Sequence, residues 1–297
     1  MNKLLCSIGI IVYNEAQNIG TLLERVTSES YPDVEINEII VVSSASTDGT
    51  DEIVEYYEKH DTRVRLITEK ERKGKSSAIN VFLKNSKNEL LIIESGDTIP
   101  AKGTIRKLIL PFNDPKVGMT GGRPVPVNSS ITFSGYAVNL LWKLHHKMAL
   151  KSPKLGEMIA FRKVFTAIPP ESAVDEASIE AEINKQQLSK IYISDAIIHN
   201  KGPEELSGFI KQRKRIETGH LWLIKKHDYQ VISQKKSVLL SLMLEEIMEH
   251  PKDILKIFSV MLFESYSRLL GRIDFYIKRK NPFAWEIIDS TKDLKKG

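Results

Sequence analysis

The chain has 297 residues, of which 41% are hydrophobic, 27% charged and 7% aromatic, with a single cysteine. These values support a self-sufficient hydrophobic core and exclude a disordered chain, a collagen-like repeat and a disulfide-stapled miniprotein. The net charge of +5 is concentrated between residues 201 and 236. A local excess of this size fits a phosphorylated ligand or an anionic surface, and we expect no nucleic-acid partner.

Short β-branched runs alternate with segments of helical periodicity through the first hundred residues. The spacing predicts strands at 7–13, 39–42, 64–67 and 90–93, with helices at 19–26, 53–57 and 76–83 between them. Strands this apolar are buried on both faces, which predicts an α/β fold with a mainly parallel, doubly wound sheet flanked by helices. Ligands bind outside the carboxyl ends of such strands, so the turns after the first, second and fourth strands are the expected site.

Beyond residue 100 the pattern is less regular. Strands are expected at 117–121, 158–161 and 191–193, and helices at 104–110, 133–150, from Asp175 and from Glu204. A boundary near residue 228 divides the chain into a first domain, 1–228, and a helical C-terminal extension, 229–297, with helices at 238–248 and 254–276. The extension allows three interpretations: packing on the first domain, a dimer contact, or amphipathic helices on an anionic membrane surface.

The sequence also bears on location. The apolar run at 4–13 lacks a small-residue cleavage site, which favours a first strand over a signal peptide. No uncharged apolar stretch reaches eighteen residues, so no membrane-spanning helix is expected. The lone Cys6 fits a reducing compartment. We therefore expect a cytoplasmic protein, with a peripheral position on the inner face of the cell membrane as the surface alternative.

Polar residues follow three of the predicted strands. They are Tyr13-Asn14-Glu15, the segment 43–50 and Ser95-Gly96-Asp97. The segment 43–50 opens a helix, whose free N–H groups favour an anion. Each turn also has an ordinary explanation, since Ser46 can cap a helix and Asp97 can form a turn.

Together these motifs resemble the family-2 glycosyltransferases of the GT-A fold, over about residues 5–225. The family's amino-terminal signature is similar to residues 11–15, and its second turn to residues 46–50. Residues 72–80 are similar to the Gly-Lys, Ala, Asn run beside the donor nucleotide. Asp97 is similar to the last Asp of the metal-binding Asp-x-Asp motif. Further matches follow in the family's order, at 121–123, 156–162, 174–177 and 212–216.

The resemblance implies an inverting transfer of a sugar from a nucleotide-sugar donor to a glycan or lipid-linked acceptor. By position, Glu176 takes the place of the family's catalytic base and Asp175 that of its neighbour. Gln212 and Arg215 match the Gln-x-x-Arg motif, which implies contact with the diphosphate or the acceptor. The residues expected around the donor are Tyr13, Glu15, Ser43, Ser46, Lys73, Lys75, Ser95 and Asp97.

The chain also departs from the family pattern. Ser43-Ser44-Ala45 replaces an acidic turn, and Ser95 replaces the first Asp of Asp-x-Asp, while Glu94 lies at a position expected to point into the sheet or to its opposite face. Three explanations stay open. We favour Mg²⁺ or Mn²⁺ held by Asp97, diphosphate and water, because Mg²⁺ commonly keeps several waters. The others are a metal-independent transferase that uses Lys and Arg, and a catalytically silent nucleotide-sugar-binding or scaffolding protein.

Two further alternatives concern single features. His199 and His220 fall near the predicted site, and either could add a metal ligand, although a hydrogen-bonded structural histidine is the more usual state. A nucleotidyltransferase on a similar sheet fits the downstream acidic and Gln-x-x-Arg elements less well.

Overall fold

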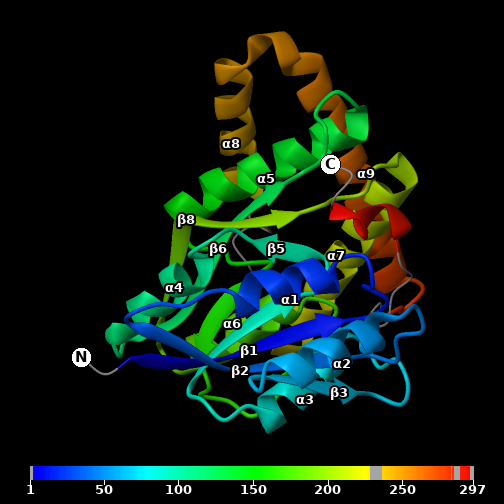
Figure 1. Cartoon of the computed structure of the whole chain (residues 1–297). Helices are drawn as coiled ribbons and strands as arrows, with labels where there is room; N and C mark the ends of the chain where they lie inside the picture. The colour runs from blue at the N-terminus through cyan, green and yellow to red at the C-terminus, as the bar shows by residue number, and fades with distance from the viewer. Residues whose placement is uncertain (1–2, 228–235, 282, 284–287, 295–297) are drawn as a thin grey trace.

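The structure is a computed structural model, and it describes residues 3–227, 236–281, 283 and 288–294. Eight strands form one mixed sheet in the order β3-β2-β1-β4-β7-β6-β8-β5. Helices cover both of its faces (Figure 1). The chain therefore has the expected α/β architecture.

The first half of the sheet is parallel. Its strands are β1 (Leu4–Val12), β2 (Val34–Ser43), β3 (Val64–Thr68) and β4 (Leu90–Ser95), with β1 pairing both β2 and β4. The helices between them are α1 (Ile19–Thr27), α2 (Thr50–His60) and α3 (Lys75–Asn85). The predicted alternation of strands and helices is confirmed here. The carboxyl ends of three of these strands, β1, β2 and β4, carry the turns that form the site.

The side chains of β1 show why helices lie on both faces. Its alternate residues Ile8 and Ile10 pack against α1 and α2, and Ile11 packs toward α3 on the other side. Gly9 also faces α3, and a Cβ there would lie 2.6 Å from the Phe82 ring. Only glycine therefore allows this close packing of α3 on the sheet.

The second half of the sheet is mixed. The strand β7 (Ile159–Arg162) runs antiparallel to both β4 and β6 (Val117–Pro126), whereas β8 (Ser189–Asn200) runs parallel to β6. An edge strand, β5 (Thr98–Pro100), pairs antiparallel with β8. We did not predict β5, and β8 extends well beyond the predicted residues 191–193. The helices of this half are α4 (Thr104–Ile109), α5 (Phe133–Lys151), α6 (Asp175–Lys185) and α7 (Leu206–His227).

The C-terminal helices α8 (Lys236–Glu249) and α9 (Ile254–Tyr276) pack on α5 and α7 (Figure 1). Their apolar side chains share a cluster with α5 and with Phe209 of α7. Gly271 of α9 allows close contact, because a Cβ there would lie 2.8 Å from the Lys214 carbonyl oxygen. The expected boundary near residue 228 lies outside the described residues. Of the helices described, none is long and apolar enough to cross a bilayer.

Candidate functional site

The turns after β1 and β2 are held together by hydrogen bonds. The Asn14 backbone N–H donates to Ser46 Oγ at 3.0 Å, and the Glu15 N–H donates to Thr50 Oγ1 at 2.8 Å. The turn after β4 lies against them, since a Cβ on Gly96 would be 2.8 Å from Glu15 Cγ. Three polar turns thus meet at one edge of the sheet, as the parallel arrangement predicts.

A cavity of about 970 Å³ opens at this edge. The three turns form one side, and side chains from α5, α6, α7, α8 and α9 form the others. Nine of the residues expected at the site line it together: Tyr13, Glu15, Lys75, Ser95, Asp97, Asp175, Glu176, Gln212 and Arg215. The site is therefore assembled from segments more than 200 residues apart.

Lys75 and two carboxylates form one closely paired group in this cavity. Lys75 Nζ, at the start of α3, lies 2.9 Å from Asp175 Oδ2 and 3.2 Å from Glu176 Oε1, at the start of α6. Burial opposes the charge of Lys75, but the two carboxylates outweigh it and raise its pKa. Burial and the neighbouring Asp175 raise the pKa of Glu176. One ammonium group thus pairs with two carboxylates.

Glu157 is a further carboxylate of the cavity that we did not single out from the sequence. Burial, Asp97 and Glu176 raise its pKa to about 7, and its Oε1 accepts a hydrogen bond from Asn200 Nδ2 at 3.1 Å. Its backbone is left-handed, with φ of 58°. The sequence signal was the match at 156–162, where Glu157 stood inside the motif without an assigned role.

Glu94 and Glu15 are two further carboxyl groups of this region. Glu94 is fully buried, and its Oε1 accepts a hydrogen bond from Thr98 Oγ1. Burial, Glu157 and Asp97 raise its pKa to about 8. Burial and Asp97 likewise raise the pKa of Glu15 to about 7. These carboxylates repel one another, so each holds its proton to higher pH than an exposed glutamate would.

This donor set fits a divalent cation. Hard oxygen ligands on mutually repelling carboxylates are what Mg²⁺ and Mn²⁺ bind, and Glu94 Oε2 is buried without a hydrogen-bond partner. Within the described ranges, one cluster of three possible metal ligands has its atoms already close together, at Glu246, Glu249 and His250. Lys143 and Lys147 neutralise that cluster through ion pairs with Glu246 and Glu249. It lies on α8, away from the turns.

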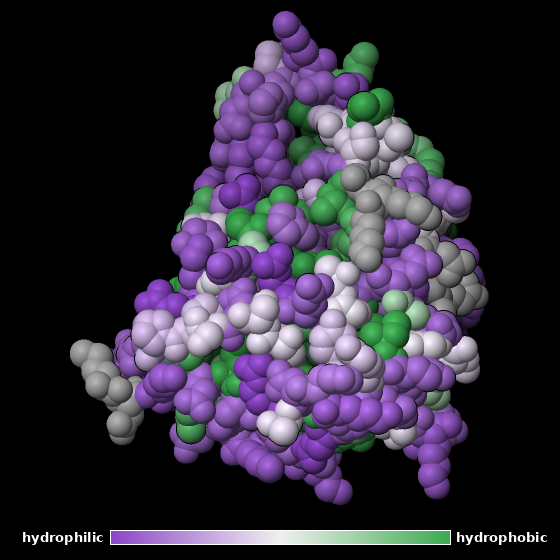
Figure 2. Space-filling model, in the orientation of Figure 1, coloured by the Kyte–Doolittle hydropathy of each residue, from purple (hydrophilic) through white to green (hydrophobic). Residues whose placement is uncertain are grey.

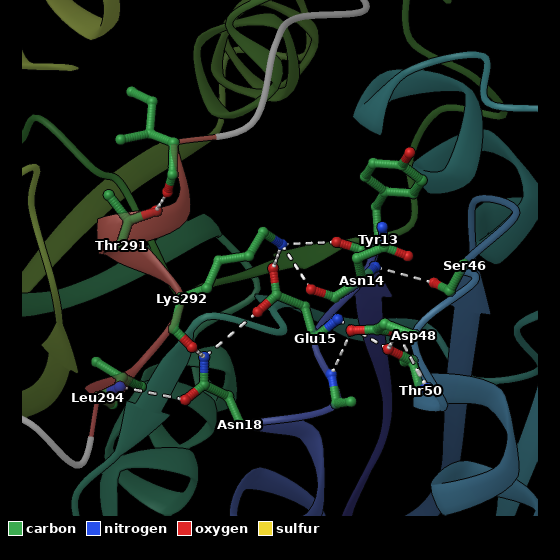
Figure 3. Close-up of polar contacts among 12 residues, drawn as sticks. Tyr13, Asn14, Glu15, Asn18, Ser46, Asp48, Thr50, Thr291, Lys292 and Leu294 are labelled. Atoms are coloured by element: carbon green, nitrogen blue, oxygen red, sulfur yellow. Dashed lines mark hydrogen bonds and ion pairs between the residues drawn. The ribbon is translucent and has the colours of Figure 1, made fainter. Parts of the chain in front are cut away.

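The C-terminal segment reaches into the site. Lys292 Nζ donates to the backbone oxygens of Tyr13 at 2.7 Å and Asn14 at 2.9 Å, and it pairs with the Glu15 carboxylate (Figure 3). Asn18 anchors the same segment through hydrogen bonds with the Lys292 oxygen at 2.5 Å and the Leu294 nitrogen at 3.3 Å. We did not predict Lys292, because a lone lysine 277 residues from Glu15 gives no sequence signal.

We call the carboxyl groups of Glu15, Asp97, Glu157, Asp175 and Glu176, with the buried Glu94, the acidic end of the cavity. Two side chains besides Lys75 and Lys292 bring positive charge to it. The Arg72 guanidinium stacks over the Tyr13 ring, 4.1 Å from its centroid, a cation–π geometry. Arg215 of α7 faces the carboxylates: burial lowers its pKa to about 10, while Asp175, Glu176, Asp97 and Glu157 oppose that shift.

Three expected donor residues lie outside the cavity lining. The buried Ser43 donates to Ser46 Oγ at 2.9 Å, so both support the turn beneath the site. Lys73 points outward, is 59% exposed and pairs with Glu71 at 3.2 Å. Of the two histidines considered as ligands, His220 lines the opposite end of the cavity, where burial and nearby cations lower its pKa to about 3.

Sequence comparison connects this geometry with known proteins. AglE, a glycosyltransferase of Haloferax volcanii, is 32% identical over 116 residues, which are 39% of this chain and 38% of AglE's own length. The poly-β-1,6-N-acetyl-D-glucosamine synthase of Staphylococcus epidermidis is 24% identical over 286 residues, 92% of this chain and 67% of the synthase.

Solved structures share the fold. A mannosyltransferase from Pyrobaculum calidifontis, in complex with GDP-Man and Mn²⁺, superposes with a TM-score of 0.62 at 19% identity, over 99% of this chain and 84% of that one. The glucosyl-3-phosphoglycerate synthase of Mycobacterium tuberculosis, in complex with Mn²⁺, UDP and glucosyl-3-phosphoglycerate, gives 0.54 at 14% identity, over 77% and 82%. The GT-A fold expected from the motifs is thus confirmed.

The family pattern covers the part of the site that precedes α6 in the chain, whereas Asp175, Glu176, Gln212 and Arg215 lie beyond it. The sequence model described as glycosyl transferase family 2 matches residues 7–173, from β1 to the loop before α6. This match spans more than half of the chain and includes the turns after β1, β2 and β4. The chain therefore belongs to glycosyl transferase family 2 and is a glycosyltransferase.

Proposed function

We propose that this enzyme transfers a sugar with inversion from a nucleotide-sugar donor to a glycan or lipid-linked acceptor. The observation that carries the proposal is the meeting of Glu176 and Asp97 in one cavity at the carboxyl ends of the parallel strands. A direct displacement needs a base for the acceptor hydroxyl and neutralisation of the departing diphosphate. The cavity offers residue types for both tasks.

Glu176 is the proposed base. It lines the cavity, and burial and the neighbouring Asp175 raise its pKa, which makes it a stronger base than an exposed glutamate. A Glu176 oxygen takes the proton of the acceptor hydroxyl. The acceptor oxygen bonds to the anomeric carbon as the bond from that carbon to the diphosphate breaks, and the nucleoside diphosphate leaves. Asp175 is buried and paired with Lys75, which supports a role in fixing the start of α6.

Asp97, with Glu157 beside it, is the proposed holder of Mg²⁺ or Mn²⁺. When bound, the cation would supply positive charge for the leaving diphosphate. Arg215 and Gln212 line the cavity from α7 and would contact the diphosphate or the acceptor. A guanidinium can bind phosphate oxygens in a bidentate manner.

The remaining donor contacts lie at the turns after β1, β2 and β4. The Tyr13 ring with its stacked Arg72 offers a flat surface for the base of the nucleotide, and Glu15 and Ser95 line the same end of the cavity. Ser43 and Ser46 would act by holding the turn after β2. Lys73 is exposed just before the first residue of α3. Its positive charge would attract the anionic donor as the donor enters the site.

We also propose that the enzyme works in the cytoplasm, where residues 229–297 form an extension that meets the inner face of the membrane. The apolar side chains exposed on α8 and α9 support this part of the proposal, among them Met248, Leu255 and Phe258.

The test is detection of nucleoside diphosphate released from UDP-, GDP- and dTDP-sugars, with and without Mn²⁺ or Mg²⁺. We expect release from one donor, dependent on metal, and its loss in Asp97→Ala. Asp195→Ala is the matched control, because Asp195 is exposed and pairs with Lys107 outside the cavity. Saturable binding of a donor without turnover, in the presence of candidate acceptors, would instead support a silent binding protein. Release of pyrophosphate would indicate a nucleotidyltransferase.

A further inference from the structure

A second charged region lies at the far end of the cavity, beyond Arg215. Lys154, Arg213 and Arg268 line it, and the buried His145 and His220 lie beside them. We call these five residues the basic end. The proposed transfer chemistry uses none of them, so their role needs a separate explanation.

With Arg272, which lines the cavity next to the basic end, the guanidinium groups here outnumber the carboxylates that pair with them. Glu264 accepts from Arg213 through both oxygens, each at 2.7 Å, and from Arg268 at 2.8 Å. Glu217 lies 3.7 Å from Arg268 and 3.2 Å from Arg272. Three guanidinium groups therefore share two carboxylates.

Lys154 adds a further cation without a counterion. In the part of the chain that the structure describes, its ammonium makes no hydrogen bond or ion pair, although it faces Arg213, Arg268, Glu180 and Glu264. Glu180 is already paired with Lys190. Burial, Arg213 and Arg268 lower the pKa of Lys154 to about 8, which outweighs the opposing effect of the two glutamates. A lysine held in such a positive field gains from an incoming anion.

The walls next to the basic end are apolar. They come from three helices and consist of Leu141, Trp142 and Met148 of α5, Leu239, Leu240 and Met243 of α8, and Val260, Met261 and Leu269 of α9. Leu240 and Leu269 line the cavity and are also each 55% exposed, so they form its mouth. Outside it, Leu244, Phe258 and Leu262 continue the apolar surface. In Figure 2, hydrophobic side chains reach the surface near the top of the view, where Figure 1 places α8 and α9.

We propose that this half of the cavity binds an acceptor in which a phosphate is attached to a hydrocarbon chain. The phosphate lies between Lys154 and the Arg213–Arg268 pair, and the chain follows the apolar walls out through the mouth at Leu240 and Leu269. The acceptor also carries a sugar on this phosphate, and the reactive hydroxyl of that sugar points toward Glu176, which takes its proton. This inference rests on the proposed function and names its acceptor class.

Two features together select this ligand. A free glycan would leave the apolar walls and the unpaired ammonium of Lys154 without partners, and inorganic phosphate would use the basic end alone. A phosphate-bearing lipid complements both the charge and the exposed apolar mouth. The same continuity explains why large apolar side chains surround the opening of this half of the cavity.

The test is calorimetric titration of the full chain with decyl phosphate, kept below its micelle concentration. Inorganic phosphate, decanol and decyltrimethylammonium are the comparison probes. We expect decyl phosphate to bind at least tenfold more tightly than each of the three. Equal binding of the cationic amphiphile would overturn the proposal, as would binding to anionic vesicles with no binding of monomeric decyl phosphate.

Paired variants localise the binding. Lys154→Met should weaken decyl phosphate binding at least tenfold, whereas Lys185→Met, an exposed lysine outside the cavity, should not. Leu240→Ser should weaken decyl phosphate without changing phosphate binding, whereas Leu255→Ser, which is 78% exposed and outside the lining, should change neither. Full affinity in Lys154→Met and in Lys154→Gln would refute the inference. Nucleoside diphosphate release in these variants would show that the proposed function stands on its own.

Discussion

At the scale of single residues, three of the five non-glycine residues with a positive φ, among the residues that the structure describes, lie at or beside the site. The positive φ angles of Asn14, Ala45 and Glu157 are 54°, 60° and 58°, although none of the three is glycine. Asn14 is compensated by the hydrogen bond from Thr47 N–H to its side chain, and Glu157 by the one from Asn200. Such strain persists where the surroundings fix the backbone, which is typical of binding sites.

The proposed base gives the first prediction. Glu176→Gln keeps the side-chain shape but cannot take a proton, so turnover should fall by about 10²- to 10⁴-fold with little change in donor affinity. Single-turnover rates and donor titration measure the two quantities. The control is Glu182→Gln on the same helix, where the side chain pairs with Lys185 outside the cavity. Turnover at the wild-type rate would remove Glu176 from this role.

At the scale of secondary structure, the contact between α7 and α9 gives the second prediction. A Cβ on Gly271 would lie 2.8 Å from the Lys214 oxygen and 2.9 Å from Glu217 Cβ. Gly271→Ala should therefore push the helices apart and lower the free energy of unfolding by about 1–3 kcal/mol. Gly20→Ala in α1 is the control, since its nearest neighbour would lie at 3.7 Å. Equal stability of both variants in denaturant melts would mean that the contact between α7 and α9 has room for the added methyl group.

The C-terminal segment gives the third prediction. Lys292→Ala removes three polar contacts to the turn after β1, so residues 288–294 should exchange their amide hydrogens at least tenfold faster. Hydrogen exchange by mass spectrometry measures this. Lys278→Ala, which breaks an exposed pair with Asp274 at the end of α9, should leave the exchange of this segment unchanged. Unchanged exchange in Lys292→Ala would show that Asn18 alone holds the segment.

The elements differ in how well the sequence predicts them. The first four strands can be predicted from the sequence, because a strand that is buried on both faces is a continuous apolar run. The three-residue β5 has no such pattern, and its pairing with β8 is set by contacts 100 residues apart. The second half of β8 contains Asp195 and His199, which interrupt the apolar pattern. This part of the strand is formed by pairing with β6 and β5.

At the scale of the whole molecule, the cavity is acidic at one end and basic at the other. Motif positions predicted most of the acidic end, because parallel strands bring their carboxyl ends to one edge. Lys292, Lys154 and Arg268 were not predicted, because their positions at the cavity depend on how the helices and the C-terminal segment fold back over the sheet. Long-range packing of this kind leaves no periodic signal in the sequence.

The acidic end makes stability depend on pH. The pKa values of Glu15 and Glu157 are raised to about 7, and that of Glu94 to about 8. An unfolded glutamate releases its proton near pH 4.3. Between these values the folded state holds protons that the unfolded state has lost, so the free energy of unfolding should fall as the pH rises from about 5 to 8.

A divalent cation should reverse this loss. It binds the ionised carboxylates, so the Tm without metal should be lower at pH 8 than at pH 5.5, by roughly 5 °C, and Mn²⁺ should raise it more at pH 8. Asp97→Asn removes one source of repulsion and a proposed ligand. It should therefore raise the metal-free Tm at pH 8 and abolish most of the Mn²⁺ effect, whereas Asp195→Asn should do neither. A Tm without this pH dependence, or an undiminished Mn²⁺ effect in Asp97→Asn, would mean that the carboxylates are not the metal site.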